Sequence, residues 1–390
     1  MEVKVHGRQR HQAGDAKDHT TLKTSATGIR EDESFFGPMQ SMYRARLKLP
    51  LDGAQWTGIT TALAAKLLEQ GLVDAVLTMK ADDDDPWKPV PVLVTEASAL
   101  AQCRGMRMGY APLLALIEPA LKRGYKKLAV IAIPCQVYAL RALDHDWQAQ
   151  GLQSLYVIGT PCSDNTTTER FHRFLSLLDA QPETINYLEF RADYQVELRY
   201  TDGRKRFIPF LQLPLSELPA DFFPSTCKTC VDYSNVLSDI TVGYMGGSGD
   251  QWIIVRNDKG RLILDQLQED VVLTAPVQAG QRKSAVKAFH ENLLKAAGGL
   301  PIRRMPKCLR PIVGWLMPRL GPRGLEFARA RIEMKAIETI VSLRQQYPSK
   351  MKTMVPRHIW KLVEPYGIRP LNNELGPQAS VSAKVHQGLK

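Results

Sequence analysis

The chain has 390 residues, of which 44% are hydrophobic, so it can bury the core of one large domain or of two modest ones. Its formal net charge of +11 favours acidic partners, but no nucleic-acid-binding motif accompanies the charge, and we predict no nucleic-acid partner. The N-terminus lacks the apolar segment of a signal peptide, and no run of about 18 uncharged apolar residues occurs, which together predict a cytoplasmic protein.

Residues 1–40 are polar and lack sustained periodicity, which predicts a flexible N-terminal arm. After them come a glycine-bearing turn, a helix with Leu63 and Leu67 on its apolar face, and a strand. Residues 41–275 continue as alternating strands and helices. This order predicts an α/β fold with a mostly parallel sheet and flanking helices.

The turn before the first long helix holds four residues suited to a phosphate, Gly53, Gln55, Thr57 and Gly58. Free backbone N–H groups and the positive end of the helix dipole favour an anion at a helix start. A tight turn with a hydroxyl N-cap accounts for the same residues without a ligand, because the spacing is no standard glycine-rich fingerprint. The residues alone leave both interpretations open.

A second glycine-rich turn contains Arg107 and Tyr110 and opens the helix near Pro112. A guanidinium beside a helix N-terminus suits a pyrophosphate, with which it forms charge-assisted hydrogen bonds. Surface packing of both side chains is the alternative. Cys103, just before this turn, is predicted to be a buried or incidental thiol.

Two apolar segments predicted as strands both end in the dipeptide Pro-Cys, which places Cys135 after the first and Cys162 after the second. The segment between has apolar residues at helical spacing and ends at Gly151, so the unit is predicted to be a βαβ crossover. The strands of such a unit are parallel, and their carboxyl ends lie at one edge of the sheet. We therefore expect the two cysteines to face the same crevice.

Asp164 and Asn165 follow the second cysteine, where either residue can cap a helix that reaches about residue 178. No Ser-His-Asp or paired-carboxylate arrangement is discernible, so these two residues are the candidates for a catalytic role, with capping as the structural alternative. Residues 184–210 alternate as strands do and contain an Asp-Gly turn, which predicts an antiparallel β appendage.

A Cys-x-x-Cys pair, Cys227 and Cys230, supplies two more thiols, and a hairpin is predicted further on, at residues 257–260. Together with the two strand-end cysteines the pair suits either zinc or an iron–sulfur cluster. Zinc usually takes two tight pairs, whereas a 4Fe-4S cluster, being larger, tolerates scattered ligands better. A dithiol redox pair and unliganded core cysteines are further alternatives.

Residues 276–375 are predicted to form a helical C-terminal region, and residues 376–390 a disordered tail. The basic, proline-rich stretch 305–324 contains Trp315 and is too short and too charged to span a membrane. It either lies at a membrane interface or forms a helix that is buried or in contact with another protomer. We treat Cys308, which lies in it, as structural.

Three groups of residues resemble a known family: GAQWTGITTAL, the pair IAIPCQVYALRAL and IGTPCSDN, and CKTCVDYSNVLSDITVGYMGG. They are similar to the beta-subunit family of coenzyme F-420 hydrogenases and dehydrogenases. The likeness runs over about residues 42–333. Within the family the chain looks most like the branch of 7-hydroxymethyl chlorophyll a reductase and divinyl (proto)chlorophyllide 8-vinyl reductase.

The resemblance implies one FAD and one 4Fe-4S cluster, both held by residues 41–275, with ferredoxin as the electron donor. It assigns the cluster to Cys135, Cys162, Cys227 and Cys230. The residues that it implies for binding the flavin are Gly53, Gln55, Trp56, Thr57, Thr60, Arg107, Tyr110 and Gln136.

Two departures from the family pattern concern the electron path and the substrate. Chlorophyll-type members carry a cysteine-rich segment for a second cluster, just upstream of a stretch like residues 5–10. Because the chain begins at this stretch, we expect a truncated start, or electron entry through one cluster or a partner subunit. The string GMRMGYAPL looks closer to the hydrogenase branch, which bears on the substrate.

We therefore predict an oxidoreductase, a ferredoxin-dependent flavin and iron–sulfur reductase that reduces the 8-vinyl or 7-hydroxymethyl group of a chlorophyll-pathway tetrapyrrole. Its positive charge would help to dock an acidic carrier. A homo-oligomer and peripheral contact with a photosynthetic membrane are also expected. The alternatives are a subunit that passes electrons between ferredoxin and a deazaflavin or other small acceptor, a non-catalytic electron-transfer subunit, and a zinc-stabilised binding protein.

Overall fold

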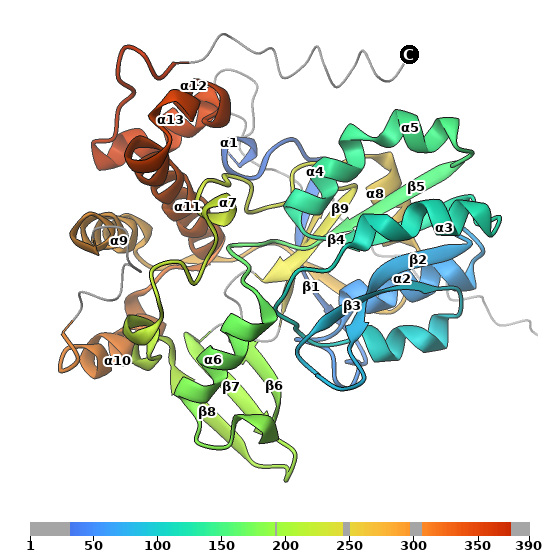
Figure 1. The fold of residues 1–390 in the computed structure, drawn as a ribbon, viewed down its shortest axis with the longest axis horizontal. Coiled ribbons are helices and arrows are strands. Elements are labelled where there is room, and N and C mark those ends of the chain that lie inside the picture. Colours follow the sequence, from blue (N-terminus) through green and yellow to red (C-terminus); the bar gives the residue numbers. More distant parts are fainter. Residues whose placement is uncertain (1–31, 192, 245–249, 297–305, 376–390) are drawn as a thin grey trace, which may run out of the picture.

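The computed structural model describes residues 32–191, 193–244, 250–296 and 306–375, and its centre is an eight-stranded sheet of order β11-β1-β10-β9-β5-β4-β2-β3 (Figure 1). The strands are β1 Ser41–Leu47, β2 Ala75–Ala81, β3 Pro89–Val94, β4 Lys127–Ala132, β5 Ser154–Gly159, β9 Ile240–Tyr244, β10 Gln251–Val255 and β11 Val271–Thr274. The predicted N-terminal arm up to residue 31 and the predicted tail 376–390 lie outside the described residues.

The middle of the sheet is parallel and its edges are antiparallel. Strands β2, β4, β5 and β9 pair in parallel, while β3, β10 and β11 run the other way and β1 runs with the parallel set. Most strands therefore point in one direction, and the predicted α/β fold with a mostly parallel sheet is confirmed. The predicted crossover is also confirmed, since β4 and β5 are parallel neighbours joined by helices.

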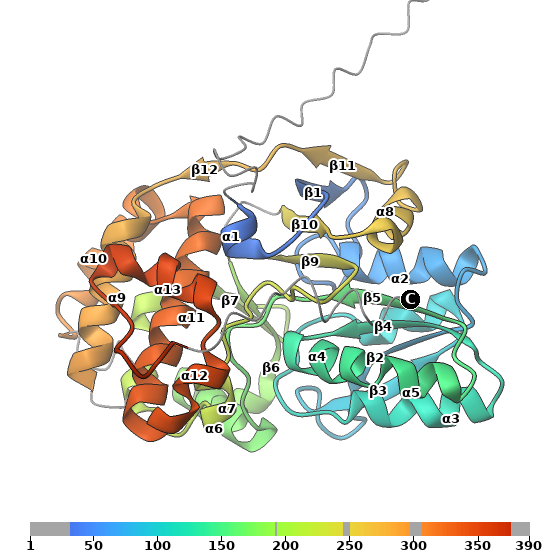
Figure 2. The same cartoon turned by 90° about the horizontal axis from the view of Figure 1, so that it is seen from above.

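Helices cover both faces of the sheet, which explains why the central strands are apolar throughout. On one face lie α2 Ile59–Glu69 and α8 Asp258–Asp265, and on the other α3 Ile117–Lys122, α4 Pro134–Ala142 and α5 Asp144–Ala149 (Figure 2). Side chains of β4 alternate between the two cores: Ala129 packs with the first group, and Leu128 and Val130 pack with the second.

The start of α8 corrects one prediction. A hairpin was expected at residues 257–260, but the side-chain oxygen of Asn257 accepts a hydrogen bond from the backbone N–H of Gly260 at 2.9 Å. This contact is an N-cap, and the chain continues as a helix rather than turning back into a strand.

The predicted antiparallel appendage is present as a separate three-stranded sheet of β6 Ile185–Phe190, β7 Gln195–Tyr200 and β8 Lys205–Pro209. Helix α6, Thr168–Leu178, packs on it through Phe171, Phe174 and Leu175. The residue that caps α6 is Thr167, whose hydroxyl accepts from the N–H of Arg170, so the helix begins later than the predicted caps Asp164 and Asn165.

The described residues of the C-terminal part are mainly helical and pack against the β1 and β10 end of the sheet. Its helices are α9 Arg282–Ala296, α10 Arg310–Leu320, α11 Leu325–Gln346, α12 Met351–Met354 and α13 Arg357–Val363. A short two-stranded pair, β12 Gln278–Ala279 and β13 Arg323–Gly324, was not predicted. Within the described ranges, no helix has both the length and the apolarity needed to cross a membrane.

Helix α1, Glu33–Phe36, fixes the end of the predicted arm to this part of the structure. Phe36 is fully buried, and its ring lies edge-on to Trp252 with 4.8 Å between the centroids. Both rings belong to the same hydrophobic core as α11. The long helix α11 is therefore held firmly beside β10 of the central sheet.

Candidate functional site

The four cysteines assigned by resemblance come from three segments that the fold brings to one end of the sheet. Cys135 lies in the first turn of α4, directly after β4, and Cys162 follows the end of β5. Cys227 lies in α7, Ser225–Lys228, and Cys230 follows this short helix. The backbone N–H of Cys162 donates to the carbonyl of Tyr233 at 3.1 Å, which joins the β5 loop to the Cys-x-x-Cys loop.

The four thiols lie close enough to affect one another's ionisation. Burial raises the pKa of Cys162, and the charges of Asp164, Cys227, Cys135 and Cys230 raise it further. Burial also raises the pKa values of Cys227 and Cys230, and the charge of Cys135 raises both further. The donor set therefore suits a positively charged centre, because four adjacent thiolates need compensating charge to persist.

Four thiols are the donor set of a 4Fe-4S cluster, so the residues present fit such a cluster in kind. Their side chains do not form a closed cage for a single ion. Within the described ranges, no group of three or more Cys, His, Asp or Glu side chains is arranged to hold a metal ion. The assignment of the four cysteines as iron–sulfur ligands remains a prediction.

Helix α11 contributes a buried cation that the sequence did not reveal. The ammonium of Lys335 lies 2.6 Å from Asp164 Oδ1 and 3.0 Å from Glu338 Oε2, and its side chain is 5% exposed. Burial lowers the pKa of Lys335, but attraction by Glu338 and Asp164 outweighs burial and raises it overall, so the ammonium stays charged. Its charge offsets part of the rise that burial causes in the pKa values of Cys227 and Cys230.

Further contacts of α11 fix the same loops. The hydroxyl of Thr339 donates to the carbonyl of Cys230 at 3.1 Å, and the guanidinium of Arg331 donates to the hydroxyl of Ser163. Arg331, Lys335 and Thr339 are spaced four residues apart and therefore lie on one stripe of the helix. This stripe runs along the two loops that carry Cys162 and Cys230.

Asp164 and Asn165, the catalytic candidates, have structural partners. Asp164 is the ion-pair partner of Lys335. The side-chain nitrogen of Asn165 donates to the carbonyl of Gly109 at 2.8 Å, and its oxygen accepts from the N–H of Thr166 at 2.9 Å. Asn165 thus ties the cysteine region to the turn that contains Arg107 and Tyr110.

Asn235 connects the ends of the two central strands and was not singled out from the sequence. Its side-chain nitrogen donates to the carbonyls of Ala132, the last residue of β4, at 2.8 Å and of Thr160, the first residue after β5, at 3.3 Å. Its backbone is left-handed, with φ of 60°, and Asp232 Oδ1 accepts from its N–H at 2.8 Å. Asn235 therefore holds both cysteine-bearing strand ends in register.

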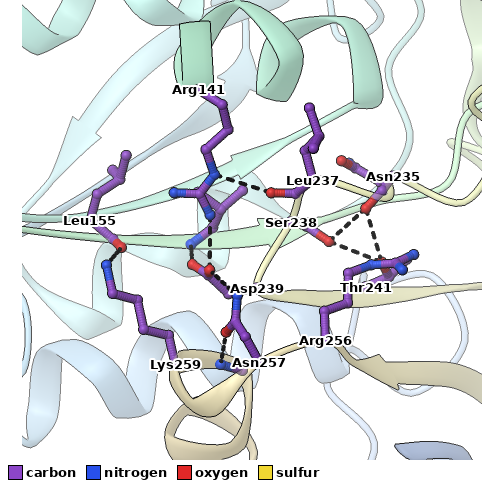
Figure 3. A network of polar contacts seen from close by, with 12 residues as sticks. Arg141, Leu155, Asn235, Leu237, Ser238, Asp239, Thr241, Arg256, Asn257 and Lys259 are labelled. Carbon is purple, nitrogen blue, oxygen red and sulfur yellow. Dashed lines mark hydrogen bonds and ion pairs between the residues drawn. The ribbon is translucent and has the colours of Figure 1, made fainter. Parts of the chain in front are cut away.

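The string that follows the Cys-x-x-Cys pair is largely structural. Asp239 is buried; its Oδ2 accepts from the N–H of Val157 at 2.7 Å, and its Oδ1 accepts from Arg141 and Asn257, each at 2.8 Å (Figure 3). Beside it, the Nε of Arg256 donates to the hydroxyl of Thr241 at 3.1 Å, and burial lowers the pKa of Arg256 to about 10. These contacts lock β5, β9, α4 and α8 together.

The two glycine-rich turns predicted to bind the flavin lie against each other. Arg104 Nη1 donates to the carbonyl of Asp52 at 2.9 Å, and Arg107 Nη1 donates to the carbonyl of Arg104 at 2.8 Å. Gly53, with φ of +72°, has open space where a side chain would be. The second turn thus links the first turn, through Asn165, to the cysteine region.

Three buried N–H donors at these turns lack a hydrogen-bond partner within the described part of the chain: Trp56 Nε1, Arg104 Nε and Arg107 Nε. A buried donor without an acceptor is costly, so native structures usually supply one. Burial also lowers the pKa of Arg107, whose Nη atoms donate to backbone carbonyls of residues 102–105. The two turns therefore fit a ligand with phosphate or carbonyl oxygens, as a flavin dinucleotide has.

Trp56 carries a further mark of a ligand site. Its φ of 49° is left-handed, which is unusual for a bulky residue and tends to occur at functional sites. The backbone N–H donates to Glu189 Oε1 at 3.2 Å, and the indole stacks on Tyr244 with 5.5 Å between centroids and 9° between planes. The first turn is therefore pinned to the appendage by Glu189 and to β9 by Tyr244.

Not every predicted flavin residue is free to face a ligand. The hydroxyl of Thr57 accepts from the N–H of Leu47 at 3.2 Å and donates to Gln251 Oε1 at 3.1 Å. Gln251 also accepts from the N–H of Ile59 at 3.0 Å, so the start of α2 is capped from within the protein. This arrangement favours the structural alternative for Thr57.

The remaining predicted residues divide between the two regions. The carbonyl of Gln55 accepts from the N–H of Gly58 in the first turn, and Thr60, half-buried, lies in the first turn of α2. Tyr110 is exposed near the cysteines, whose charges contribute, after burial, to its raised pKa. Gln136 accepts from the N–H of Ile133 at 3.2 Å and so caps α4.

A recess of ≈ 280 Å³ adjoins the exposed Cys135. Its wall is mainly apolar and consists of Ala111, Pro112, Leu113, Leu114, Ala115, Cys135, Gln136 and Ala139. Of the four cysteines assigned to the cluster, Cys135 is exposed, while Cys162, Cys227 and Cys230 are half-buried.

Comparison with known proteins gives consistent matches. Two models of one family, the coenzyme F420 hydrogenase/dehydrogenase beta subunit, match this chain: the N-terminal model over residues 42–118 and the C-terminal model over residues 125–279. The chloroplastic 7-hydroxymethyl chlorophyll a reductase of Oryza sativa subsp. japonica is 34% identical over 352 residues, or 86% of this chain and 73% of the rice protein. An uncharacterized protein of Nostoc sp. is 34% identical over 336 residues, 86% of this chain and 82% of its own length.

A solved structure of the F420-reducing hydrogenase complex from Methanosarcina barkeri contains a chain of the same fold. The TM-score is 0.54 at 20% sequence identity, and the match covers 62% of this chain and 84% of the other. The family models together span more than half of the sequence, and the relatives whose names state a function include a reductase and hydrogenase subunits. The chain is therefore an oxidoreductase of the coenzyme F420 hydrogenase/dehydrogenase beta-subunit family.

Proposed function

We propose that the protein is a reductase dependent on FAD and one 4Fe-4S cluster, which takes electrons from ferredoxin or a similar acidic carrier. Its substrate is a chlorophyll-pathway tetrapyrrole, reduced at the 8-vinyl or the 7-hydroxymethyl group. The rice relative, named for 7-hydroxymethyl chlorophyll a, supports this substrate class, and its chloroplastic location supports work beside a photosynthetic membrane.

One observation supports the proposal most directly: Asn165 ties a loop that carries the proposed cluster ligands to the turns with unpaired donors. Asn165 contacts both regions, since its carbonyl lies 3.8 Å from Cys227 Sγ and its side chain bonds to Gly109. A one-electron centre and a two-electron centre must lie close together to exchange electrons. The contacts of Asn165 support such a placement of the two sets of residues proposed here.

In this proposal Cys135, Cys162, Cys227 and Cys230 hold the cluster, and Arg104, Arg107 and Trp56 bind the flavin. Bound there, the cluster would supply single electrons, and the flavin would combine two of them with a proton for transfer as a hydride. Lys335 offsets the negative charge of the thiolates, because its ammonium is buried beside them. The buried Nε of Arg107 would donate to the pyrophosphate of the flavin, and the stacked rings of Trp56 and Tyr244 hold the first turn in place.

Electrons would enter at Cys135, the exposed member of the cysteine set. Tyr110 and Tyr138 are exposed large side chains near it, and Lys228, next to Cys227, is a partly exposed cation. Aromatic and positive groups together suit contact with an acidic carrier. Lys228→Glu should therefore raise the KM for the carrier and leave the KM for the tetrapyrrole unchanged.

The test begins with protein purified without oxygen. Flavin absorption, about four irons per chain as one cubane requires, and tetrapyrrole-dependent oxidation of reduced ferredoxin would support the proposal. A colourless protein with one zinc per chain would refute it and favour a zinc-stabilised binding protein. Flavin and iron without turnover of any chlorophyll-pathway tetrapyrrole would refute the substrate class.

A second candidate is a subunit that passes electrons between ferredoxin and a deazaflavin or other small acceptor. The fold shared with a chain of the F420-reducing hydrogenase complex favours it. Oxidation of reduced deazaflavin, in the absence of tetrapyrrole turnover, would distinguish this function from the first. Electron transfer to neither acceptor would favour a non-catalytic electron-transfer subunit.

A further inference from the structure

Helix α10, Arg310–Leu320, lies at the margin of the molecule, on the side away from the eight-stranded sheet (Figures 1 and 2). One of its sides packs on the appendage, where it meets β8 and the short helical turn Phe210–Gln212. Gly314 marks the contact, since a side chain there would come within 3.6 Å of Pro209. The opposite side of α10 faces outward.

This outward side carries large apolar side chains. Leu309, Ile312, Trp315 and Leu320 are each between 47% and 62% exposed. At 100° per residue, they fall within about 140° of the helix circumference, together with Arg319. An exposed apolar group of this kind, gathered on one face, marks an interaction surface rather than chance exposure.

The segment that carries this face is basic. Residues 306–323 contain four basic residues, Lys307, Arg310, Arg319 and Arg323, and no acidic residue. Arg310 is buried and the ammonium of Lys307 lies 4.0 Å from Glu217, so the exposed Arg319 and Arg323 supply the positive charge here. The guanidinium of Arg319 lies over the indole of Trp315, 4.3 Å from its centroid, and donates to the carbonyl of Trp315 at 3.0 Å. An aromatic ring with an adjacent guanidinium suits the level of lipid headgroups, where one end is apolar and the other wet.

We propose that α10 docks the protein on an anionic lipid bilayer, with Ile312 and Trp315 at the acyl boundary and Arg319 and Arg323 at the headgroup phosphates. The charge pattern favours lipid over a second copy of the chain, because a two-fold contact would place this basic face against itself. Lipid binding through α10 does not depend on the proposed reaction.

The test is co-sedimentation of the full chain with vesicles of phosphatidylcholine alone and of phosphatidylcholine with phosphatidylglycerol. The wild-type protein should sediment with the anionic vesicles and much less with the neutral ones, and added salt should weaken binding. The variant I312S/W315S should bind the anionic vesicles at least about tenfold more weakly than the wild type, because two apolar side chains no longer enter the bilayer. Both residues are exposed, so the variant should fold normally, which its thermal midpoint will show.

A matched control is L49S/L371S, which removes two exposed leucines from elsewhere on the surface and should bind as the wild type does. Trp315→Phe should retain most binding but lose the blue shift of tryptophan emission on anionic vesicles. Equal sedimentation of wild type and I312S/W315S, or equal binding to neutral vesicles, would overturn the proposal. A dimer that I312S/W315S abolishes, with no vesicle binding by the wild type, would instead assign the face to a second copy and equally overturn it.

Discussion

The ammonium of Lys335 lies 2.6 Å from the carboxylate of Asp164, 171 positions away in the sequence, with 5% and 15% of the two side chains exposed. The pair joins the C-terminal helix α11 to the loop that carries Cys162. It thus links the part of the chain beyond the family-model matches, which end at residue 279, to the centre of the candidate site.

Lys335→Met should destabilise the protein by about 3–5 kcal/mol, because it leaves two carboxylates, Asp164 and Glu338, buried without their cation. Lys335→Arg keeps the charge and should cost much less. Urea unfolding of the two variants in metal-free form measures the difference. If both variants lost equally little free energy of unfolding, the ion pair would contribute little to the stability of the fold.

Replacing Cys227 or Cys230 by Ser should abolish iron binding while leaving part of the flavin bound, since the turns with unpaired donors lie in other segments. The measurement is iron content with the visible spectrum, on protein purified without oxygen. Cys308→Ser serves as the control, because that thiol is exposed and distant in sequence from the other cysteines. Full iron content in both Cys227 and Cys230 variants would show that the ligands are misassigned.

Arg107→Met should weaken flavin binding roughly 10- to 100-fold, the cost of one hydrogen bond to a charged group. The reason is that Arg107 has a buried Nε without an acceptor in the described part of the chain. Flavin released on denaturation, per mole of protein, measures the effect. Arg123→Met, at an exposed position, is the matched control, and equal flavin content in the two variants would contradict the assignment.

Much of this site could be predicted from the sequence because its determinants are local. The apolar strands that end near Cys135 and Cys162 identify the crossover, and parallel strands bring both cysteines to one edge. The Cys-x-x-Cys spacing likewise needs no tertiary information. The antiparallel appendage follows from alternation and an Asp-Gly turn.

The rest depends on contacts between distant segments. Lys335 and Thr339 lie on the side of α11 that faces the cysteine loops, but helical spacing does not identify that side, because α11 is buried around much of its circumference. The partner of Lys335, Asp164, lies 171 positions away and was not predicted to pair with it. Asn257 begins a helix rather than a hairpin because its side chain reaches the N–H of Gly260. Among possible caps of α6, the geometry selects Thr167 because Asp164 and Asn165 are held by other partners.

Asn235→Ala should destabilise the protein by about 1–3 kcal/mol through loss of the hydrogen bonds to Ala132 and Thr160, with roughly 1 kcal/mol more for the left-handed backbone. Asn235→Gly loses the same hydrogen bonds but tolerates the backbone conformation. Alanine should therefore be the less stable of the two in urea unfolding. If the free energy of unfolding of Asn235→Gly were equal to or lower than that of Asn235→Ala, the backbone conformation at this position would carry no strain.

The acid side of the stability profile should depend on Glu374. Arg344 donates to both of its carboxylate oxygens, Nε at 2.8 Å and Nη2 at 2.7 Å, and these bonds hold the pKa of Glu374 below its ordinary value of 4.5. Because the unfolded chain binds this proton more tightly, the stabilisation is fully present above pH 4.5 and is lost as the pH falls through the lower pKa of the folded state.

Glu374→Gln should therefore lower the thermal midpoint at neutral pH and reduce its dependence on pH below 4.5, where the wild type loses the stabilisation that the variant already lacks. Glu364→Gln, at an exposed position on the same C-terminal segment, should leave the profile unchanged. Thermal midpoints measured at a series of pH values for the three proteins provide the comparison. Parallel curves for wild type and Glu374→Gln would mean that Arg344 does not hold this carboxylate in solution.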